Sequence, residues 1–486
     1  MRAIRILLIA LALLSAGLMA GASLSIGTAA DQVEVWKTDL YGDPAALDGL
    51  EVTLPLEAEE QLFWTSVFSA GAPEQAETDF CTFLARRSIR YRSAADSVGV
   101  RFTGDGGGYH YLSADSEAQN DPDYWGELYF CLDAIQALAA NTPDGETRSR
   151  TYALEELTEF YPVEASIGFS YSRLEDERWP ETLLRDYFAV PVLPGASVTL
   201  SVEKSGSGGY SDVGVEFSGP WYLDNNYWSA PDGDSLLFTV GNTYVNQDTD
   251  ETGLLDGSHI PGGWGIYRLS FNDEDRTGGT LETVWSLPAG SAVLDFWGDE
   301  ARDEFCLLTA EEDTLRMRVF GGDMALRQTI DLLPFSADTH YVQTYKGEDF
   351  LVPMGYTFLN PEEDRTARYC FAVLERTEEG WALAFTGDDG VAEALNYGGF
   401  SRADDYGSEL SMAFDGKRLA VRDTGNRYSG YYTGTFTVAV YTADGLAYLG
   451  EYDCSLFPQA YADAGRYGYC QLPMDWSEPM VRWTQT

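Results

Sequence analysis

A turn followed by a strand recurs four times in the second half of this sequence, and this repeat constrains the fold more than any other feature. The clearest copies are SAPDGDSLLFTV from Ser229 and MAFDGKRLAVRD from Met412, in which an Asp-Gly turn precedes an apolar or alternating run. The turn glycines of the four copies are Gly233, Gly298, Gly347 and Gly416. Self-similarity of this kind indicates a repeated supersecondary unit.

Each copy is followed by the same pattern of a strand, a polar turn and another strand. The predicted strand pairs are Gly265 to Phe271 with Leu281 to Leu287, Leu315 to Phe320 with Ala325 to Leu332, Arg368 to Leu374 with Trp381 to Thr386, and Thr435 to Tyr441 with Leu446 to Tyr452. A repeating unit of four antiparallel strands is the blade of a β-propeller, so we predict an all-β fold, a single β-propeller of about seven irregular four-stranded blades. Tandem β-sandwiches, which also consist of short strands at regular spacing, are the alternative.

Strands that begin near Leu50 (LEVTLPL) and Leu62 (LFWTSVF) extend the pattern toward the N-terminus. Closure of a propeller requires a C-terminal strand to complete the first blade, because a closed sheet leaves no free edge. The candidates for that strand are Tyr467 to Leu472 and Met480 to Trp483.

The segments APDGDSLLF and FDGKRLAV resemble the blade motif of TolB-like β-propellers. The resemblance covers residues of roughly 200 to 455, with a long insertion at Gly241 to Pro261. It implies an architecture and no particular activity.

The segment from Leu128 to Phe160 fits two periodicities. The residues at helical spacing are Leu132, Ile135, Leu138 and Ala139. LYFCLDAIQAL, which contains them, also suits one long strand, and we favour the strand. The spacing of Leu154, Leu157 and Tyr161 is compatible with a second short helix, which the sequence does not decide. Phe188 to Val192 and Ser197 to Val202 are predicted strands.

The apolar run from Ile6 to Ala30 predicts the compartment. Arg2 and Arg5 precede it and Asp31 follows, so the positive-inside rule leaves the N-terminus in the cytoplasm. A span needs about 20 apolar residues, which the run supplies. We therefore divide the chain into an N-terminal membrane anchor or signal peptide (1–30), a linker (31–49) and a β-propeller-like domain (50–486).

The same run also contains the parts of a signal peptide. Ile6 to Ala16 is a sufficient apolar core, and AGA from Ala20 or TAA from Thr28 supplies a small-residue exit. Length favours a retained anchor, which predicts a protein of the cell membrane with its body outside the cytoplasm. A cleaved, secreted protein is the alternative.

The charge of the chain excludes one class of partner. Asp and Glu number 78 against 31 Lys and Arg, a formal net charge of −47. Such a surface repels phosphate backbones, so no nucleic acid partner is expected.

Six cysteines occur without any CxxC motif. Cys454 and Cys470 are the one pair close in sequence. An oxidising exterior would allow a disulfide between them, and the sequence does not decide whether it forms. The other four lie in apolar runs and are predicted to be buried thiols: Cys81, Cys131, Cys306 and Cys370.

No catalytic signature is present. His110, His259 and His340 are isolated and lack metal-ligand spacing, and no GxSxG motif occurs. TGDDGVAE from Thr386 lacks the aromatic residue of a sialidase-type Asp-box. No catalytic residue, resident metal or cofactor is therefore predicted.

Ca²⁺ is the metal that acidic extracellular loops favour most. The oxygen-rich segments are Asn246-x-Asp248-x-Asp250 and the group Asn272, Asp273 and Asp275. The first lacks the glycine and glutamate of a calcium loop, and a solvated turn is the favoured interpretation of both.

The segment PWYLDNNYW contains the candidate ligand-binding residues Trp221, Tyr222, Tyr227 and Trp228. Aromatic rings beside an Asp and two Asn can stack on sugars or anchor a protein partner. Packing of the rings between blades is the competing interpretation. Tyr428, Tyr431 and Tyr432 form a weaker group.

The sequence thus predicts a membrane-attached, extracytoplasmic module that binds or scaffolds a protein or cell-surface ligand without catalysis. The alternative is an extracytoplasmic hydrolase of glycans or peptides that uses carboxylates at the propeller's central mouth. The oligomeric state is not predicted.

Overall fold

The structure of the chain is a computed structural model that divides into two compact units. The units are Met1–Tyr91 with Gln343–Thr486, and Arg92–Val342. The described residues are 10–21, 33–58, 62–82, 97–103, 109–112, 126–168, 178–206, 210–249, 251–272, 278–335, 342–360, 364–395, 410–423, 435–455 and 480–484.

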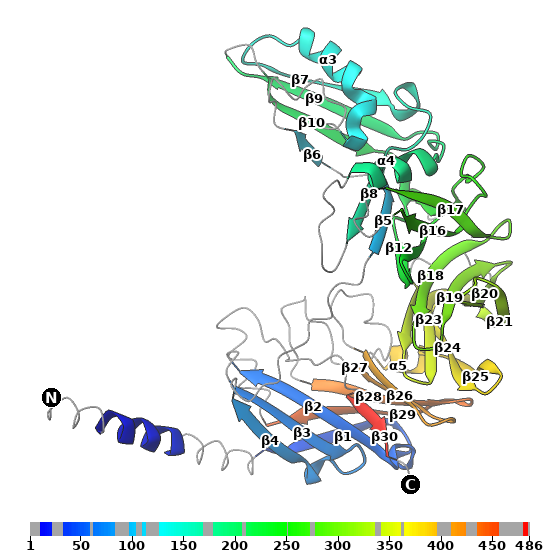
Figure 1. The fold of residues 1–486 in the computed structure, drawn as a ribbon. Helices are drawn as coiled ribbons and strands as arrows, with labels where there is room; N and C mark the ends of the chain where they lie inside the picture. Colours follow the sequence, from blue (N-terminus) through cyan, green and yellow to red (C-terminus); the bar gives the residue numbers. More distant parts are fainter. Residues whose placement is uncertain are drawn as a thin grey trace. The chain divides into compact units, whose positions relative to one another are not determined.

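Three sheets form the first unit (Figure 1). The first sheet contains, in spatial order, β30 (Val481–Trp483), β2 (Leu50–Ala58), β3 (Leu62–Ser69) and β4 (Glu77–Thr82). The second contains β22 (Val342–Lys346), β23 (Phe350–Asn360), β24 (Asp364–Thr377) and β25 (Gly380–Asp388). The third contains β1 (Val35–Gly42), β29 (Gly445–Cys454), β28 (Thr435–Thr442), β27 (Leu419–Asp423) and β26 (Leu410–Phe414). Short helices η1 (Pro44–Leu47) and α5 (Gly390–Ala394) lie between strands of different sheets, and η2 (Pro73–Gln75) lies between β3 and β4.

The C-terminal strand completes the first sheet. Val481 pairs with Val52 and Trp483 with Leu50, so β30 covers the edge of β2. The indole Nε1 of Trp483 also donates a hydrogen bond to the carbonyl oxygen of Ala413, 3.1 Å away. The segment from Met480 to Trp483 therefore supplies the predicted closing strand, while Tyr467 to Leu472 lies outside the described residues.

Five sheets form the second unit. Two of these sheets have four strands in chain order, as in a blade. One contains β12 (Tyr227–Asp232), β13 (Ser235–Val240), β16 (Gly265–Phe271) and β17 (Gly279–Ser286). The other contains β18 (Ala292–Asp299), β19 (Glu304–Glu311), β20 (Thr314–Gly321) and β21 (Leu326–Pro334). The smaller sheets are β11 (Trp221–Leu223), β14 (Thr243–Asn246) and β15 (Thr252–Leu254), and the pair β5 (Ser97–Phe102) and β8 (Val163–Gly168). The fifth is β6 (Tyr109–Leu112), β10 (Tyr210–Ser218), β9 (Ser197–Lys204) and β7 (Thr147–Ala153).

The predicted repeat matches these blades. The four predicted strand pairs are the neighbours β16–β17, β20–β21, β24–β25 and β28–β29. Gly233 and Gly416 lie in turns with positive φ, as the Asp-Gly motif requires, whereas Gly298 lies within β18. The all-β class and the recurrence of four-stranded antiparallel sheets are confirmed.

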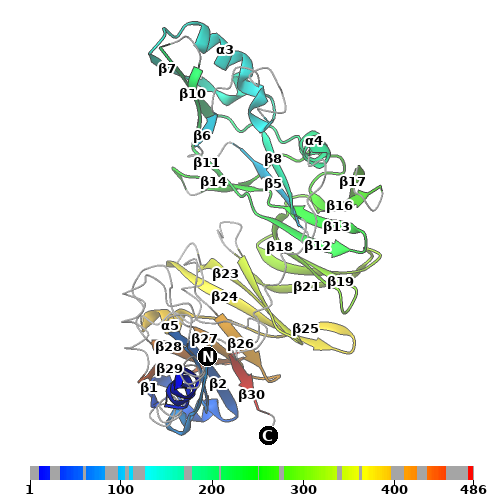
Figure 2. The same cartoon turned by 60° about the vertical axis from the view of Figure 1, so that its left-hand side comes forward.

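Helices interrupt the blades in the second unit. They are η5 (Gly126–Cys131), α3 (Leu132–Ala140), η6 (Leu154–Glu156) and α4 (Arg178–Tyr187). Helix α3 covers one face of the sheet that contains β9 (Figures 1 and 2). The strand favoured for LYFCLDAIQAL was wrong, because Leu132, Ile135 and Ala139 recur at helical spacing and are all buried.

The strand predicted at Phe188 to Val192 was also wrong. This segment makes only an isolated bridge between Pro191 and Phe160. Phe188 and Val190 are buried side chains outside any strand, so their apolar character reflects core packing. Leu154, left open between structures, begins the short helix η6.

The described N-terminal part of the chain contains one helix and one strand. Residues 10–21 of the apolar run are helical and exposed, and its other residues lie outside the described ranges. No helix among the described residues has the length and apolar character needed to cross a bilayer. Within the predicted linker, β1 forms a strand that pairs with β29, with Trp36 opposite Asp453.

Candidate functional site

The four predicted aromatic residues lie on two different sheets. Trp221 and Tyr222 belong to β11, whereas Tyr227 and Trp228 belong to β12. The segment between these strands turns the chain from one sheet to the other, so the four rings do not share one sheet face.

The sheet β11–β14–β15 has one packed face and one open face. On the packed side, the rings of Trp221 and Tyr244 meet edge to face at 5.0 Å, and the indole Nε1 of Trp221 donates to the carbonyl oxygen of Pro194 at 2.7 Å. Tyr244 covers Gly253, where a Cβ would collide with its ring. Because side chains alternate along a strand, Tyr222 lies on the opposite, open face, where it is 55% exposed. Leu254 is 39% exposed on the same face.

Asn225, between the aromatic residues, and Ser229, directly after them, hold the neighbouring strand β5. The Asn225 side chain accepts a hydrogen bond from the Phe102 N–H at 2.8 Å and donates one to the Phe102 carbonyl at 3.2 Å. The Ser229 hydroxyl bonds the N–H and the carbonyl of Val98 in the same manner, at 2.9 and 3.1 Å. These side chains replace the ladder hydrogen bonds of a strand, so they serve the fold.

Asp224 is also engaged internally. Its carboxylate accepts hydrogen bonds from the Asn226 N–H at 3.1 Å and from the Thr243 hydroxyl at 3.2 Å. Burial raises the pKa of Asp224 above its usual value, although these hydrogen bonds oppose the shift. The carboxylate therefore braces the connection between the two sheets.

Tyr227 and Trp228 contact the protein interior. The guanidinium carbon of Arg101 lies 5.7 Å from the centre of the Tyr227 ring, and a Cβ on Gly99 would touch that ring. Trp228 packs against the buried cluster that contains Ala230 and Leu237. Of the four predicted residues, Tyr222 offers the largest surface to a ligand.

The first oxygen-rich segment is a self-contained turn. The Asn246 side-chain oxygen accepts hydrogen bonds from the N–H groups of Asp248 at 2.9 Å and Thr249 at 3.2 Å. Asp250, Asp273 and Asp275 lie outside the described residues. No cluster of three His, Cys, Asp or Glu side chains suited to a metal occurs within the described ranges.

The thiols of Cys131, Cys306 and Cys370 are buried, as predicted. Burial raises the pKa of Cys131 to about 12, which suppresses its thiolate, and the thiol donates to the Leu128 carbonyl at 3.0 Å. Cys454 is buried at the end of β29, while Cys470 lies outside the described residues. The side chain of Cys81 also lies outside them.

His259 packs edge to face on the Phe160 ring at 5.1 Å. His340 lies outside the described residues, as does the side chain of His110. Tyr428, Tyr431 and Tyr432 lie there too.

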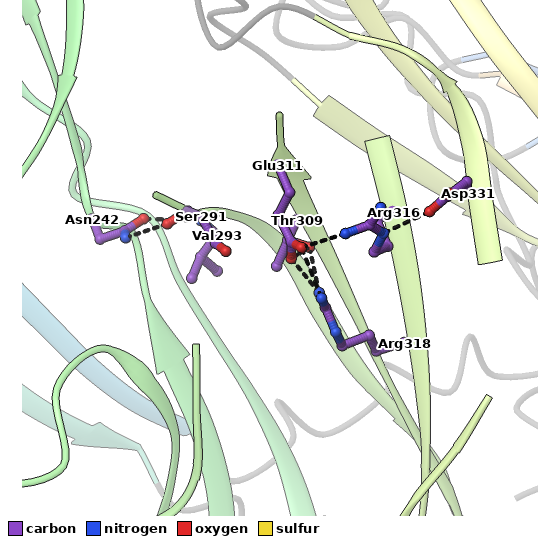
Figure 3. Close-up of polar contacts among 8 residues, drawn as sticks. All are labelled: Asn242, Ser291, Val293, Thr309, Glu311, Arg316, Arg318 and Asp331. Atoms are coloured by element: carbon purple, nitrogen blue, oxygen red, sulfur yellow. Dashed lines mark hydrogen bonds and ion pairs between the residues drawn. The ribbon is translucent and has the colours of Figure 1, made fainter. Parts of the chain in front are cut away.

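A buried ion network in sheet β18–β21 was not predicted (Figure 3). Arg318 Nη2 lies 2.8 Å from Glu311 Oε2, and Arg316 Nη1 lies 2.6 Å from the same oxygen. The Thr309 hydroxyl donates to Glu311 Oε1 at 2.7 Å, and Arg316 also pairs with Asp331. The side chains of Glu311 and Arg318 are each only 7% exposed.

The electrostatics of this network keep Glu311 ionised. Burial alone would raise its pKa, but hydrogen bonds from Arg318, Thr309 and Arg316 outweigh burial and lower the pKa to about 2. Arg318 also lies 5.3 Å from the centre of the Trp285 ring on β17. The network therefore connects two adjacent blades, and the alternating arginines of TLRMRVFG after the Glu311 strand were its signal in the sequence.

Asn242 makes a second connection between the same blades (Figure 3). Its buried side chain donates to the Ser291 carbonyl at 2.9 Å and accepts from the Val293 N–H at 2.9 Å. These two hydrogen bonds fix the start of β18 against the neighbouring sheet. Neither Asn242 nor the ion network provides a reactive group.

Neither a protein-family model nor a curated protein sequence matches the chain. Solved structures with some likeness include a prolyl endopeptidase, at 10% identity and a TM-score of 0.23, over 84% of this chain and 42% of that one. A putative 6-phosphogluconolactonase from Bacteroides fragilis has 11% identity and a TM-score of 0.25, over 84% and 95%. One from Bacteroides uniformis has 11% identity and a TM-score of 0.26, over 81% and 92%. This chain spans less than half the length of the prolyl endopeptidase, and likenesses this weak assign no activity.

Proposed function

We propose that this protein is a membrane-attached, extracytoplasmic β-propeller that binds a protein or cell-surface ligand and catalyses no reaction. Tyr222 is the observation that carries the proposal. A ring that is 55% exposed sits on a sheet whose other face is fixed by the Trp221 hydrogen bond and the Tyr244 contact. Preorganised exposed aromatics lose little side-chain entropy on binding, which suits them as anchors.

The membrane part of the proposal is supported by the run from Ile6 to Ala30 and the charges on either side of it. A relationship to TolB-like β-propellers is part of the same proposal, supported by the APDGDSLLF and FDGKRLAV segments. N-terminal sequencing of the protein from membrane and medium fractions separates a retained anchor from a cleaved signal peptide.

Photo-crosslinking in intact cells tests the binding surface. Replacement of Tyr222 by p-benzoylphenylalanine should give a crosslinked adduct after irradiation. The same replacement at Tyr129, which is 49% exposed on η5, is the matched control and should give none. Equal adducts at both positions, or none at position 222, contradict this surface. Turnover of a glycan or peptide panel by the intact protein contradicts the absence of catalysis.

Substitution separates the exposed ring from the packed ones. Tyr222→Ala should abolish the adduct formed through a photo-label placed at Leu254, and it should lower the melting temperature less than Trp228→Ala does. Trp228→Ala should instead lower stability by about 2 kcal/mol, because it removes a ring packed on the Ala230 cluster. Thermal unfolding of both variants measures the difference.

A further inference from the structure

Strand β7 is an edge strand, and most of its residues are exposed. It is the last strand of the sheet β6–β10–β9–β7, and no described strand pairs with its outer side. All residues from Thr147 to Thr151 are exposed. An unpaired edge offers backbone donors and acceptors to another strand.

The register shows which backbone groups face outward. The Lys204 N–H donates to the Glu146 carbonyl, and the Leu154 N–H donates to the Ala196 carbonyl. The even-numbered residues of β7 therefore direct their backbone N–H and carbonyl groups toward β9. Because strand residues alternate, Thr147, Ser149 and Thr151 direct their N–H and carbonyl groups away from the sheet. An added antiparallel strand would find consecutive hydrogen-bonding positions there.

The charge of β7 is opposite to that of the chain. The strand TRSRTYA contains two arginines and no acid, within a chain of net charge −47. Arg148 and Arg150 pair with Val202 and Leu200 of β9, so both arginines lie on the same side of the sheet. The Arg150 guanidinium carbon lies 4.5 Å from the centre of the Tyr152 ring, which orients the cation.

We propose that the outer edge of β7 is an interaction surface that pairs with an extended segment of a partner protein carrying carboxylates at alternate positions. Guanidinium groups two residues apart match such carboxylates across a strand pair, and arginine binds them through two parallel hydrogen bonds. Backbone pairing supplies affinity and the charges supply specificity, as in other cases of strand addition.

A second copy of this chain does not fit the same edge through its own β7. Antiparallel pairing of two β7 strands brings arginines near arginines, which is repulsive. The alternative role for arginines on an edge strand is to prevent aggregation. If that were their only role, no acidic strand would bind to β7. The two roles predict different results.

Fluorescence anisotropy with the full-length protein tests the proposal. The probe is a labelled peptide of alternating Thr and Glu, and its matched control has Lys in place of each Glu. The Glu peptide should bind and the Lys peptide should not. The double substitution Arg148→Glu with Arg150→Glu should weaken the Glu peptide by about tenfold or more and favour the Lys peptide instead.

A third peptide separates strand pairing from charge attraction. N-methylation of alternate residues of the Glu peptide removes backbone donors and should abolish binding. Undiminished binding of the methylated peptide overturns strand addition, and a Glu peptide that fails to bind at millimolar concentration overturns the whole proposal. Tyr222→Ala should leave peptide binding unchanged, so this result stands apart from the crosslinking test of the proposed function.

Discussion

Sheets β18–β21 and β6–β10–β9–β7 both have four strands in the second unit, yet they bury their residues differently. Every residue of β19, EFCLLTAE, is buried, and the ion network lies at its end. In β7, TRSRTYA, the first five residues are exposed. A strand buried on both faces is mostly apolar and needs ionic partners for its charges, as Glu311 has in Arg318, whereas an exposed edge strand can carry charges in water. The sheet β18–β21 therefore belongs to the structural scaffold, whereas β7 offers an exposed surface.

The largest effect is expected where the scaffold holds charge. Arg318→Met leaves Glu311 buried beside only part of its former partners, so the free energy of unfolding should fall by about 3 kcal/mol. Arg327→Met is the matched control, because Arg327 is 48% exposed and 3.8 Å from Glu304, and it should cost less than about 1 kcal/mol. Chemical denaturation measures both. Equal losses would remove the distinction between buried and exposed pairs.

An intermediate effect is expected from pH. The pKa of Glu311 is lowered from 4.5 to about 2 in the folded protein, so its contribution to stability is complete above the unfolded pKa and is lost as pH falls toward the folded pKa. The stability difference between the unmodified protein and Glu311→Gln should therefore shrink between roughly pH 5 and pH 2. Denaturation series across that range measure the difference. A constant difference would show that Glu311 does not titrate in this way.

The smallest effect is expected at the paired threonines of β7 and β9. Thr151 and Thr199 share a hydrogen bond of 2.9 Å between exposed hydroxyls. Thr151→Ala should change the free energy of unfolding by less than about 0.5 kcal/mol, because water replaces the lost partner. A loss as large as that of Arg318→Met would mean that β7 belongs to the scaffold after all.

Prediction from sequence succeeded where one pattern had one structural meaning. Asp-Gly turns followed by short apolar or alternating runs placed β13 after Gly233 and β27 after Gly416, because a turn with positive φ before such a run leaves few alternatives. It failed at LYFCLDAIQAL, whose apolar residues fit either period. It failed again at Phe188 to Val192, where burial without strand pairing gives the same composition.

The candidate site was predicted only in part. The sequence placed Tyr222 and Trp228 together because they are close in the chain. Their environments differ since β11 and β12 belong to different sheets, and only one of the two rings lies on an open face. Asn225 was grouped with the candidate ligand-binding aromatics, yet its side chain bonds the backbone of β5, which is distant in sequence.

The sequence by itself determined the all-β class, the repeated four-stranded unit and the acidic charge, because local periodicity, turn chemistry and charge are properties of short stretches. It reduced the strand that completes the first sheet to two candidate segments, and the pairing of β30 with β2 selected one of them. Tertiary structure decided which aromatic ring is exposed, that Glu311, Arg316 and Arg318 form one network, and that β7 ends its sheet. Burial and partner choice depend on residues far apart in the chain, and a single sequence does not encode them locally.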